Sequence, residues 1–511
     1  IKQVNASRAY RYLPLTLPKD VRQYVRDAVR KGVYSDVQMK VKGDLARMPF
    51  SSAQEGEFHI AGRLRDVEFD YMPAALTAPG TPAWPRLHGL SGTLVFDRQG
   101  MKLSDAKART EHPQTGLVLN NIQAQIPNMV EQATLDVSAE NKGPASQVLG
   151  WVQKSPLDKM LGSVLRDAQA SGQLQTRFKL NIPLLASHQT KLQGSVTLSG
   201  NDLRMVPAMP MLEKVQGQIQ FNESGFALNG VSARLLGGSV RVEGGMKPAT
   251  PNESSLSLRA QGEVTAEGLR QARELQPLNV LAKQLSGSTT YTAHLGWKQG
   301  QPDLSIQSQL EGLTLKLPAP LGKSAQMVMP LHIRSRGQGT GAAVQDQIQI
   351  DLGRVASVQY IRDLSGPMPQ VLRGSMALGN TSLMPPMPDA GVSAMVSLNA
   401  FSVDEWQALW LAAQNEAPPR SSTRDRDTFV QSYLPTRIAL QAETLTAEGR
   451  TLHQVVAGGT REGRLWRANV DARELSGQVE FRPSAGDQLG QLYARLARLN
   501  LPSSSAAEVE R

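Results

Sequence analysis

The stretch Gly92-Thr-Leu-Val-Phe-Asp-Arg-Gln-Gly-Met-Lys-Leu103 occurs in a second, related form further along the chain. The second copy is Gly217-Gln-Ile-Gln-Phe-Asn-Glu-Ser-Gly-Phe-Ala-Leu228, at a constant offset of 217 − 92 = 125 residues. Each copy alternates apolar and polar residues, passes through a polar turn that contains glycine, and then alternates again. This pattern predicts a β-hairpin. A hairpin that recurs at a fixed offset indicates that the fold is built from repeated strand units.

The two hairpins share a two-faced pattern of side chains. Leu94 and Phe96 point to one face of the first copy, and Ile219 and Phe221 occupy the matching positions of the second. The alternate positions of the first strand in the second copy are glutamine and asparagine. Because successive side chains of a strand point to opposite faces, the pattern predicts a sheet with one apolar and one solvated face.

The composition favours many short strands over compact enzyme domains. The chain has 511 residues, enough for about three domains, and only 40% of them are hydrophobic. Aromatic residues make up 5%, whereas 44 glycines and 31 prolines indicate many turns. The net charge of +10 is compatible with an anionic partner, but no Lys/Arg block reaches five residues, which argues against nucleic-acid binding.

The chain contains no cysteine, which excludes a disulfide framework, a thiolate zinc site and a cysteine nucleophile. No apolar run approaches the ~18 residues of a membrane-spanning helix. The sequence begins at Ile1 and shows no signal peptide. We therefore expect an internal fragment whose membrane anchor lies outside it.

Helical periodicity predicts a small number of helices. The segment 155–170 has the most regular apolar stripe, with Ser155 as its cap and Pro156 in its first turn. Gly32 is expected to end a helix that starts at Pro18. The expected helices are 18–32, 155–170, short pieces within 268–285, a helix opened by the capping box Ser402–Glu405, and 489–500.

Strands fill most of the remaining chain, and the helices between them suggest a division into segments. Clean period-two runs include 313–317 and 348–352. Residues 416–427 are expected to form a mobile loop, and the polar tail after Pro502 is expected to be disordered. The predicted β segments are 1–154, 155–265, 266–400 and 401–502, followed by the disordered tail 503–511.

The sequence offers little support for catalysis. Gly322-Lys323-Ser324 resembles the end of a phosphate-binding loop, but Leu317 stands where the first glycine is required. The glycines at 337, 339 and 341 precede an alternating strand instead of the helix that a dinucleotide site needs. The seven histidines show no metal-ligand spacing, and no carboxylate pair stands out as an acid–base couple. We expect no enzyme, cofactor or metal site.

Several ordered segments nevertheless resemble a known family, the YhdP branch of the AsmA-like proteins of Gram-negative envelopes, which are relatives of TamB. The segment Leu317-Pro-Ala-Pro-Leu-Gly-Lys323 is the most specific of them. The others include Tyr12-Leu-Pro14, Lys42-Gly-Asp-Leu45, Met48-Pro-Phe50, Trp84-Pro85, Ser155-Pro-Leu157, Leu180-Asn-Ile-Pro-Leu184, Gly477-Gln-Val-Glu-Phe-Arg-Pro483 and Ala494-Arg-Leu-Ala-Arg-Leu499.

The resemblance implies a mostly β fold: a long, twisted antiparallel sheet that curls into an elongated hydrophobic groove, with a few amphipathic helices. It implies a protein anchored in the inner membrane that crosses the periplasm and carries phospholipids toward the outer membrane, supporting the integrity of that membrane. Phospholipids, the two membranes and envelope proteins would be its partners.

Simple physics is compatible with this implication. If roughly half the residues lie in strands of about nine, on the order of 28 strands at ~4.8 Å each give a sheet over ~100 Å long. The few predicted helices could not cover its apolar face, which acyl chains could occupy instead. We predict that the groove is lined by Leu94, Phe96, Val196, Leu198, Ile219, Phe221, Leu313, Leu315, Ile348 and Ile350.

The main alternative is a structural protein of the envelope. Tandem β-sandwiches or a β-solenoid would place the same apolar side chains in a filled core. Such a protein would serve in assembly or adhesion and would leave no continuous path for a lipid. Residue patterns alone leave both possibilities open.

Overall fold

The computed structural model shows a mostly β protein. Its description excludes residues 14–17, 78–79, 81, 111–115, 132, 162–164, 187–188, 206–208, 248–255, 276–280, 299–300, 339–344, 367–368, 409–430, 448, 483–489 and 501–511. The described residues form 27 strands and a few short helices. They divide into two compact units, Ile1–Leu235 with Val240–Pro248, and Leu236–Ser239 with Ala249–Arg511.

The first unit is an antiparallel sheet with three α-helices. The helices are α1 (Lys19–Ala28), α2 (Ala145–Lys154) and α3 (Leu157–Met160), and the 3-10 helices are η1 (Ala6–Tyr12), η2 (Leu45–Arg47) and η3 (Ala74–Leu76). The strands are β1 (Gln3–Asn5), β2 (Val29–Gly43), β3 (Gly56–Phe69), β4 (Leu87–Asp97), β5 (Gly100–Thr110), β6 (Val118–Ile126), β7 (Thr134–Pro144), β8 (Gln169–Ser171), β9 (Gln173–Pro183), β10 (Lys191–Arg204), β11 (Leu212–Asn222), β12 (Gly225–Leu235) and most of β13 (Gly238–Met246).

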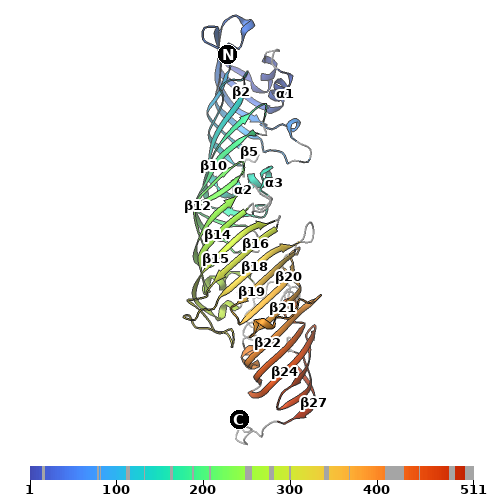
Figure 1. Cartoon of the computed structure of the whole chain (residues 1–511). Coiled ribbons are helices and arrows are strands. Elements are labelled where there is room, and N and C mark those ends of the chain that lie inside the picture. Colours follow the sequence, from blue (N-terminus) through green and yellow to red (C-terminus); the bar gives the residue numbers. More distant parts are fainter. Residues whose placement is uncertain are drawn as a thin grey trace. The chain divides into compact units, whose positions relative to one another are not determined.

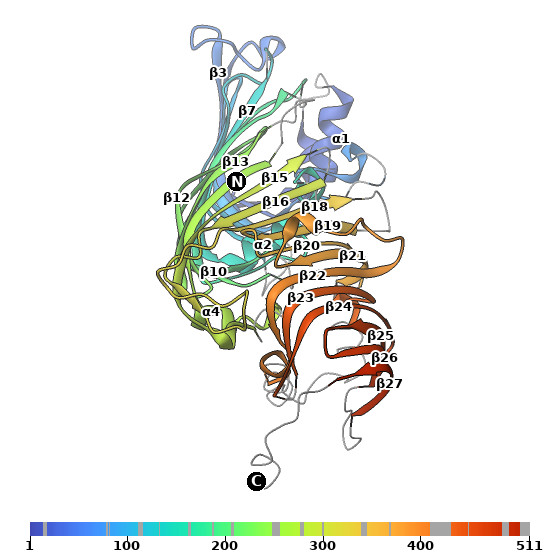
Figure 2. The same ribbon diagram turned by 60° about the horizontal axis from the view of Figure 1, so that its bottom comes forward.

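Strands that follow one another in the chain pair with one another. Strands β2 to β7 pair successively, β7 pairs with β9, and β9 pairs with β10, β11 and β12 in turn, all antiparallel. The short β1 adds to β2, and β8 pairs with β10. Figures 1 and 2 show α1 and α2 on the same side of this sheet.

The second unit continues the same architecture. Its helices are α4 (Ala266–Gln271), η5 (Arg273–Leu275), η6 (Ala282–Gln284) and η7 (Thr381–Leu383). Its strands are β14 (Leu256–Thr265), β15 (Leu285–Lys298), β16 (Gln301–Ser308), β17 (Leu313–Leu315), β18 (Leu331–Gln338), β19 (Gln345–Leu352), β20 (Ala356–Asp363), β21 (Gln370–Leu378), β22 (Gly391–Ser402), β23 (Arg437–Ala447), β24 (Arg450–Glu462), β25 (Leu465–Asp471), β26 (Leu475–Arg482) and β27 (Gln491–Leu499).

Most pairs of the second unit are antiparallel, but β22 is an exception. It pairs in parallel with both β21 and β23. Parallel neighbours need a long return connection, which residues 379–390 and 403–436 supply. Figure 2 shows β18 to β27 following one another in order. The prediction of a mostly β, largely antiparallel fold with few helices is therefore confirmed; the parallel strand was not foreseen.

The repeated hairpins that the sequence predicts are confirmed in detail. In β4–β5, Leu94 pairs with Leu103; in β11–β12, Ile219 pairs with Leu228 at the same offset of 125 residues. The first glycine of each copy also has the same role. A Cβ on Gly92 would lie 2.6 Å from the Ala106 Cβ, and one on Gly217 would lie 2.7 Å from the Val231 Cα. The glycines therefore permit a close approach at equivalent bulges.

The first predicted helix is shorter than expected. Helix α1 ends at Ala28, and β2 begins at Val29 instead of after Gly32. Gly32 has a φ of +122°, and a Cβ there would lie 2.6 Å from the Val67 Cα, so it is a point of close strand packing. Gly32 is therefore required for close strand packing, and it does not cap a helix.

The predicted helix 155–170 is wrong. The chain is helical before it, in α2, and Ser155 is extended, with φ −105° and ψ 168°. Pro156 explains this break, because the residue before a proline avoids the α region. Only the short α3 follows, and β8 begins at Gln169; residues 162–164 lie outside the description.

The predicted helix 489–500 is also wrong, because residues 491–499 form β27. Its leucines fit a helical stripe, but Leu492, Ala494 and Leu496 also alternate. These three residues pair with Phe481, Val479 and Gly477 of β26. An available strand edge satisfies the backbone of β27, and this outweighs a helical preference.

The remaining helix predictions have mixed outcomes. Short helical pieces occur between 266 and 284 as expected, in α4, η5 and η6. Ser402 Oγ accepts a hydrogen bond from the Glu405 amide at 3.2 Å, and residues 403–408 are helical. The end of that helix, the predicted loop 416–427 and the predicted tail lie outside the described residues. The division into four β segments stays a prediction.

Candidate functional site

Apolar side chains form continuous rows across the sheet of the first unit. Residues that pair directly on neighbouring strands place their side chains on the same face. One row starts at Leu94 and runs through Leu103, Ala124, Val137, Leu180 and Leu192. A parallel row runs through Ala139, Phe178, Gly194, Phe221 and Phe226. Val137 and Ala139 are two residues apart on β7, so both rows lie on one face.

Six predicted lining residues therefore share this face, which we call the first apolar face. Val196 and Ile219 pair with each other, and each is two residues from a member of the second row, Gly194 or Phe221. Leu198 is two residues beyond Val196, and Phe96 is two residues beyond Leu94, so both point to the same face. All six, Leu94, Phe96, Val196, Leu198, Ile219 and Phe221, are partly exposed. Contiguous apolar surface that remains partly exposed commonly marks a binding site.

The opposite face of this sheet is polar. One of its rows runs from Val95 through Lys102, Gln125, Asp136, Asn181 and Lys191. The apolar Val95 therefore belongs to the polar side.

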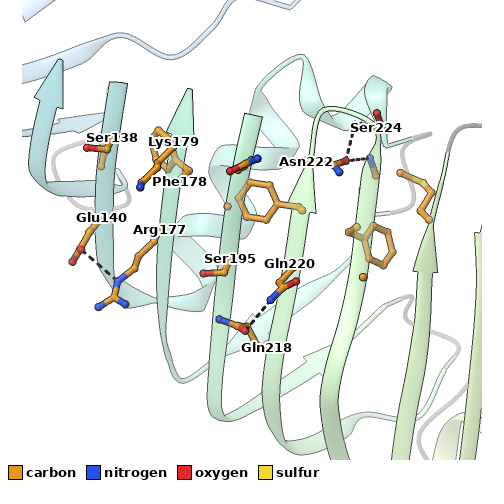
Figure 3. Close-up of a pocket in the computed structure, with 18 of the residues that line it drawn as sticks. Ser138, Glu140, Arg177, Phe178, Lys179, Ser195, Gln218, Gln220, Asn222 and Ser224 are labelled. Carbon is orange, nitrogen blue, oxygen red and sulfur yellow. Dashed lines mark hydrogen bonds and ion pairs between the residues drawn. The ribbon is translucent and has the colours of Figure 1, made fainter. Parts of the chain in front are cut away.

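A hollow of the first unit is lined by polar and apolar residues of strands β6 to β13 (Figure 3). It has a volume of about 920 Å³. Its lining includes the ion pair of Glu140 and Arg177 at 3.4 Å, and a hydrogen bond that Gln220 donates to Gln218. The same hollow is also lined by Phe178, Phe221 and Phe226 of the first apolar face, which alternate with these polar residues along their strands.

Helix α2 covers part of the first apolar face. Its Val148 and Trp151 pack against a buried cluster that includes Leu103 and Ala139. The Trp151 ring lies 6.0 Å from that of Trp84, centroid to centroid. The helix therefore lies where a groove would otherwise be open.

Three polar atoms near this cover have no hydrogen-bond partner among the described residues, although they are buried. They are Asn141 Oδ1 on β7, Thr176 Oγ1 on β9, and Trp151 Nε1 on α2. Asn141 pairs with Thr176, and its side chain is fully buried. An unpaired buried polar group costs about 1–3 kcal/mol. The contact between α2 and the sheet is therefore less favourable than its apolar area suggests.

The second unit has a longer apolar row. It begins at Ala260 on β14 and contains Ile350 on β19. It runs through Ala260, Ala293, Ile306, Ile333, Ile350, Val358, Met376, Ala394, Ile438, Gly459, Ala468, Val479 and Ala494. Ile348 lies on the same face, two residues away. We call this the second apolar face.

The row beside it is polar along almost its whole length, which places the two classes of side chain on opposite faces. It runs through Arg259, His294, Ser305, Arg334, Gln349, Gln359, Ser375, Ser393, Arg437, Thr460, Arg467, Glu480 and Tyr493.

Leu313 and Leu315 lie in a different environment from the other predicted residues. Both are buried, in a small cluster with Ala266 and Leu310. The ammonium of Lys323 lies inside this region and donates hydrogen bonds to the carbonyls of Leu310 and Leu313. Burial lowers the pKa of Lys323. The lysine of the P-loop-like segment is therefore engaged with backbone carbonyls, and the role of these leucines in a lining stays a prediction.

A covering segment also lies against the second apolar face. Tyr433 makes an edge-on contact with the Tyr360 ring at 5.2 Å, and its carbonyl accepts a hydrogen bond from the Tyr360 hydroxyl at 3.0 Å. Arg461 donates to the carbonyls of Gln431, Leu434 and Pro435. Residues 431–436, the strap, are therefore attached by polar contacts.

An ion pair lies at the margin of the same face. Arg362 Nε donates to Asp346 Oδ1 at 2.9 Å, and Ser335 donates to the other carboxylate oxygen at 2.9 Å. The Asp346 side chain is only 6% exposed. Alternation places Asp346 on the side of Ile348, so this charge is buried beside apolar residues and depends on Arg362.

The histidine and carboxylate side chains of the described residues do not gather into a metal site. These residues contain no group of three or more His, Asp or Glu side chains that could hold a metal ion. His453 and Glu474 form a single pair, and the backbone amide of His453 is the main cause of the lowered pKa of Glu474. Within the same residues, no helix has both the length and the apolar character needed to cross a bilayer.

Comparisons with known proteins identify the family. The YhdP protein family model matches residues 1–511. This chain belongs to the YhdP family. A curated relative, the intermembrane phospholipid transporter YhdP of Escherichia coli (strain K12), is 23% identical over 492 residues. That match covers 94% of this chain but 35% of the relative, so the chain spans about a third of its length. No solved structure matches significantly.

The sequence interpretation missed many residues of the apolar faces. Phe178, Phe226, Ile333, Val358 and Ile438 belong to them as clearly as the predicted residues do. Alternation within their strands was a usable signal. Assigning them to one common face required the register between strands, which no single strand reveals.

Proposed function

We propose that this chain is a section of a bridge that carries phospholipids between the two membranes of a Gram-negative envelope. In this proposal it lies in the periplasm and is anchored in the inner membrane by a segment outside this sequence. Acyl chains would move along the two apolar faces, and no catalytic step is involved. Family membership and the name of the curated relative support the proposal.

The observation that carries the proposal is the continuity of the apolar rows. In the second unit the row is unbroken by polar side chains from Ala260 to Ala494. A lipid with ~30 methylenes would lose roughly 24 kcal/mol of apolar burial if it entered water. A continuous apolar surface removes that barrier, because the acyl chain stays in contact with apolar side chains at each step.

The width of the face suits an acyl chain. On β10, the apolar positions run from Leu192 to Leu198, about 20 Å of strand at ~3.3 Å per residue. Half of a ~30 Å hydrocarbon core, the length of one extended acyl chain, is about 15 Å. One chain could therefore lie across the face.

Photocrosslinking with matched positions tests this proposal. A benzophenone amino acid at Phe221 or Ile350 is expected to capture phospholipid in cells, whereas the same group at Gln220 or Gln349 is not. Each pair differs by one residue and points to opposite faces. Capture at both members of a pair, or at neither, would contradict the proposal.

Charge insertion provides a functional test. Ile219→Asp places a carboxylate on the first apolar face and is expected to reduce phospholipid transfer at least about tenfold, since burying a charge beside an acyl chain is costly. Gln218→Asp, on the polar face, is the control and should transfer at the wild-type rate. Equal rates for both variants would show that this face is not the path.

The alternative is a structural envelope protein with a filled core. The cluster around Leu313 and the cover by α2 favour it locally. It predicts that crosslinkers on the apolar faces capture only protein side chains, and that Ile219→Asp unfolds the chain.

A further inference from the structure

Helix α2 belongs to an insertion that leaves the sheet and returns to it. The chain departs at the end of β7 and rejoins at β8, which pairs with β10. The two ends of α2 are held differently: Ala145 N donates to the carbonyl of Gly172, between β8 and β9, at 2.9 Å, and Gln153 Nε2 donates to Leu165 O within the insertion at 2.8 Å. The start of α2 is therefore fixed to the sheet, whereas its far end is tied to its own insertion by the Gln153 hydrogen bond.

The contact between α2 and the sheet is of a different kind. Val148 and Trp151 supply apolar contact, while Trp151 Nε1 and, on the strands, Asn141 Oδ1 and Thr176 Oγ1 have no partner among the described residues. Another buried asparagine has hydrogen-bond partners for both its oxygen and its nitrogen. Asn201, equally buried, donates to Ser171 O and Gln173 O and accepts from the Ser199 amide.

We propose that α2 is a lid that lifts from the first apolar face when a phospholipid enters beneath it. This inference rests on the proposed function and adds the regulation of the same path. When the lid lifts, an acyl chain replaces the side chains of Val148 and Trp151 on the apolar cluster. The indole and the Thr176 hydroxyl then gain access to water or to ester oxygens of the lipid, which accept hydrogen bonds.

The buried polar atoms keep the closed state only marginally stable. Apolar contact favours closure, and the unpaired Asn141, Thr176 and Trp151 atoms oppose it. A contact without buried polar atoms would hold the lid shut. A contact in which every buried polar atom had a hydrogen-bond partner would make the lid part of the core. Removing an unpaired atom without changing the packing should therefore close the lid.

Hydrogen exchange of the α2 amides, residues 145–154, in the purified full chain tests the lid. Vesicles of phosphatidylethanolamine and phosphatidylglycerol are expected to speed this exchange about tenfold. Without vesicles, Thr176→Val should slow it about fivefold, because the valine matches the shape of threonine and removes the unpaired hydroxyl. Thr197→Val, on the polar face of β10, is the matched control and should leave it unchanged. Trp151→Ala removes apolar contact that favours closure and should speed exchange.

Two results would overturn the lid. One is α2 exchange that vesicles do not change while a crosslinker at Phe221 still captures phospholipid, which leaves the proposed function standing. The other is an unchanged rate in Thr176→Val, which would mean that buried water pairs this hydroxyl. Failure of capture at both Phe221 and Ile350 would instead overturn the proposed function itself.

Discussion

The covers of the two apolar faces are attached in opposite ways. In the first unit, α2 rests on the sheet through Val148 and Trp151, with unpaired polar atoms beside them. In the second unit, the strap is attached by Arg461 and Tyr360 through hydrogen bonds to its backbone. An acyl chain can replace one apolar contact with another, but it cannot replace the hydrogen bonds that hold the strap. The comparison suggests a displaceable cover in one unit and a fixed one in the other.

The largest expected effect is at the buried ion pair of the second unit. Arg362→Leu leaves the Asp346 carboxylate buried without its partner and should cost about 3–5 kcal/mol of unfolding free energy. The double variant Asp346→Leu/Arg362→Leu should recover to within about 1 kcal/mol of wild type, because no charge is left unpaired. Hydrogen exchange of β18 to β20 measures both. If Arg362→Leu is as stable as wild type, the ion pair does not stabilise this unit.

The next effect is at the strap. Arg461→Met keeps the aliphatic stem but removes the donors to three carbonyls, and should loosen the strap by about 2 kcal/mol, or roughly 30-fold in amide exchange. Arg437→Met, on the polar face of β23, is the control. If exchange in residues 431–434 stays at the wild-type rate, the strap is held by apolar contact like α2, and the contrast between the units disappears.

The same type of substitution, threonine to valine, should change stability in opposite directions in the two units. Thr176→Val removes an unpaired hydroxyl in the first unit and should raise its stability by about 1 kcal/mol. Thr436→Val removes a hydroxyl that accepts from the Val392 amide at 3.0 Å, and should lower the stability of the second unit by about 1 kcal/mol. Denaturant unfolding followed by hydrogen exchange in each unit compares them. Two changes of the same sign would contradict the contrast.

A last effect is confined to alkaline pH. Burial raises the pKa of Tyr24 to about 12, with Asp70 contributing, while an unfolded tyrosine loses its proton near pH 10. The folded state therefore retains a proton that the unfolded state has lost. The resulting contribution to stability is present below pH 10 and disappears as the pH rises from 10 to about 12. Tyr24→Phe should flatten this decline in the first unit and leave the second unchanged, as measured by denaturant midpoints across that range.

The sequence predicted the faces of strands better than the limits of helices. Leu94, Phe96, Ile219 and Phe221 were placed on one face by alternation alone, and the register confirms it. The segment 489–500 was misread because its leucines fit both a helix and a strand, and the edge of β26 decided between them. Likewise, Leu313 and Leu315 alternate like lining residues, yet a local cluster encloses them.

The sequence by itself determined the strand pattern, the repeated hairpin and the separation of apolar from polar faces, because side-chain alternation is a local property of the backbone. Only the tertiary structure decided that these faces join into rows, since pairing register links residues far apart in the chain. It also decided that α2 lies over the first face and the strap over the second. Those covers depend on contacts such as Trp151 with Trp84 and Arg461 with Leu434, which no local pattern encodes.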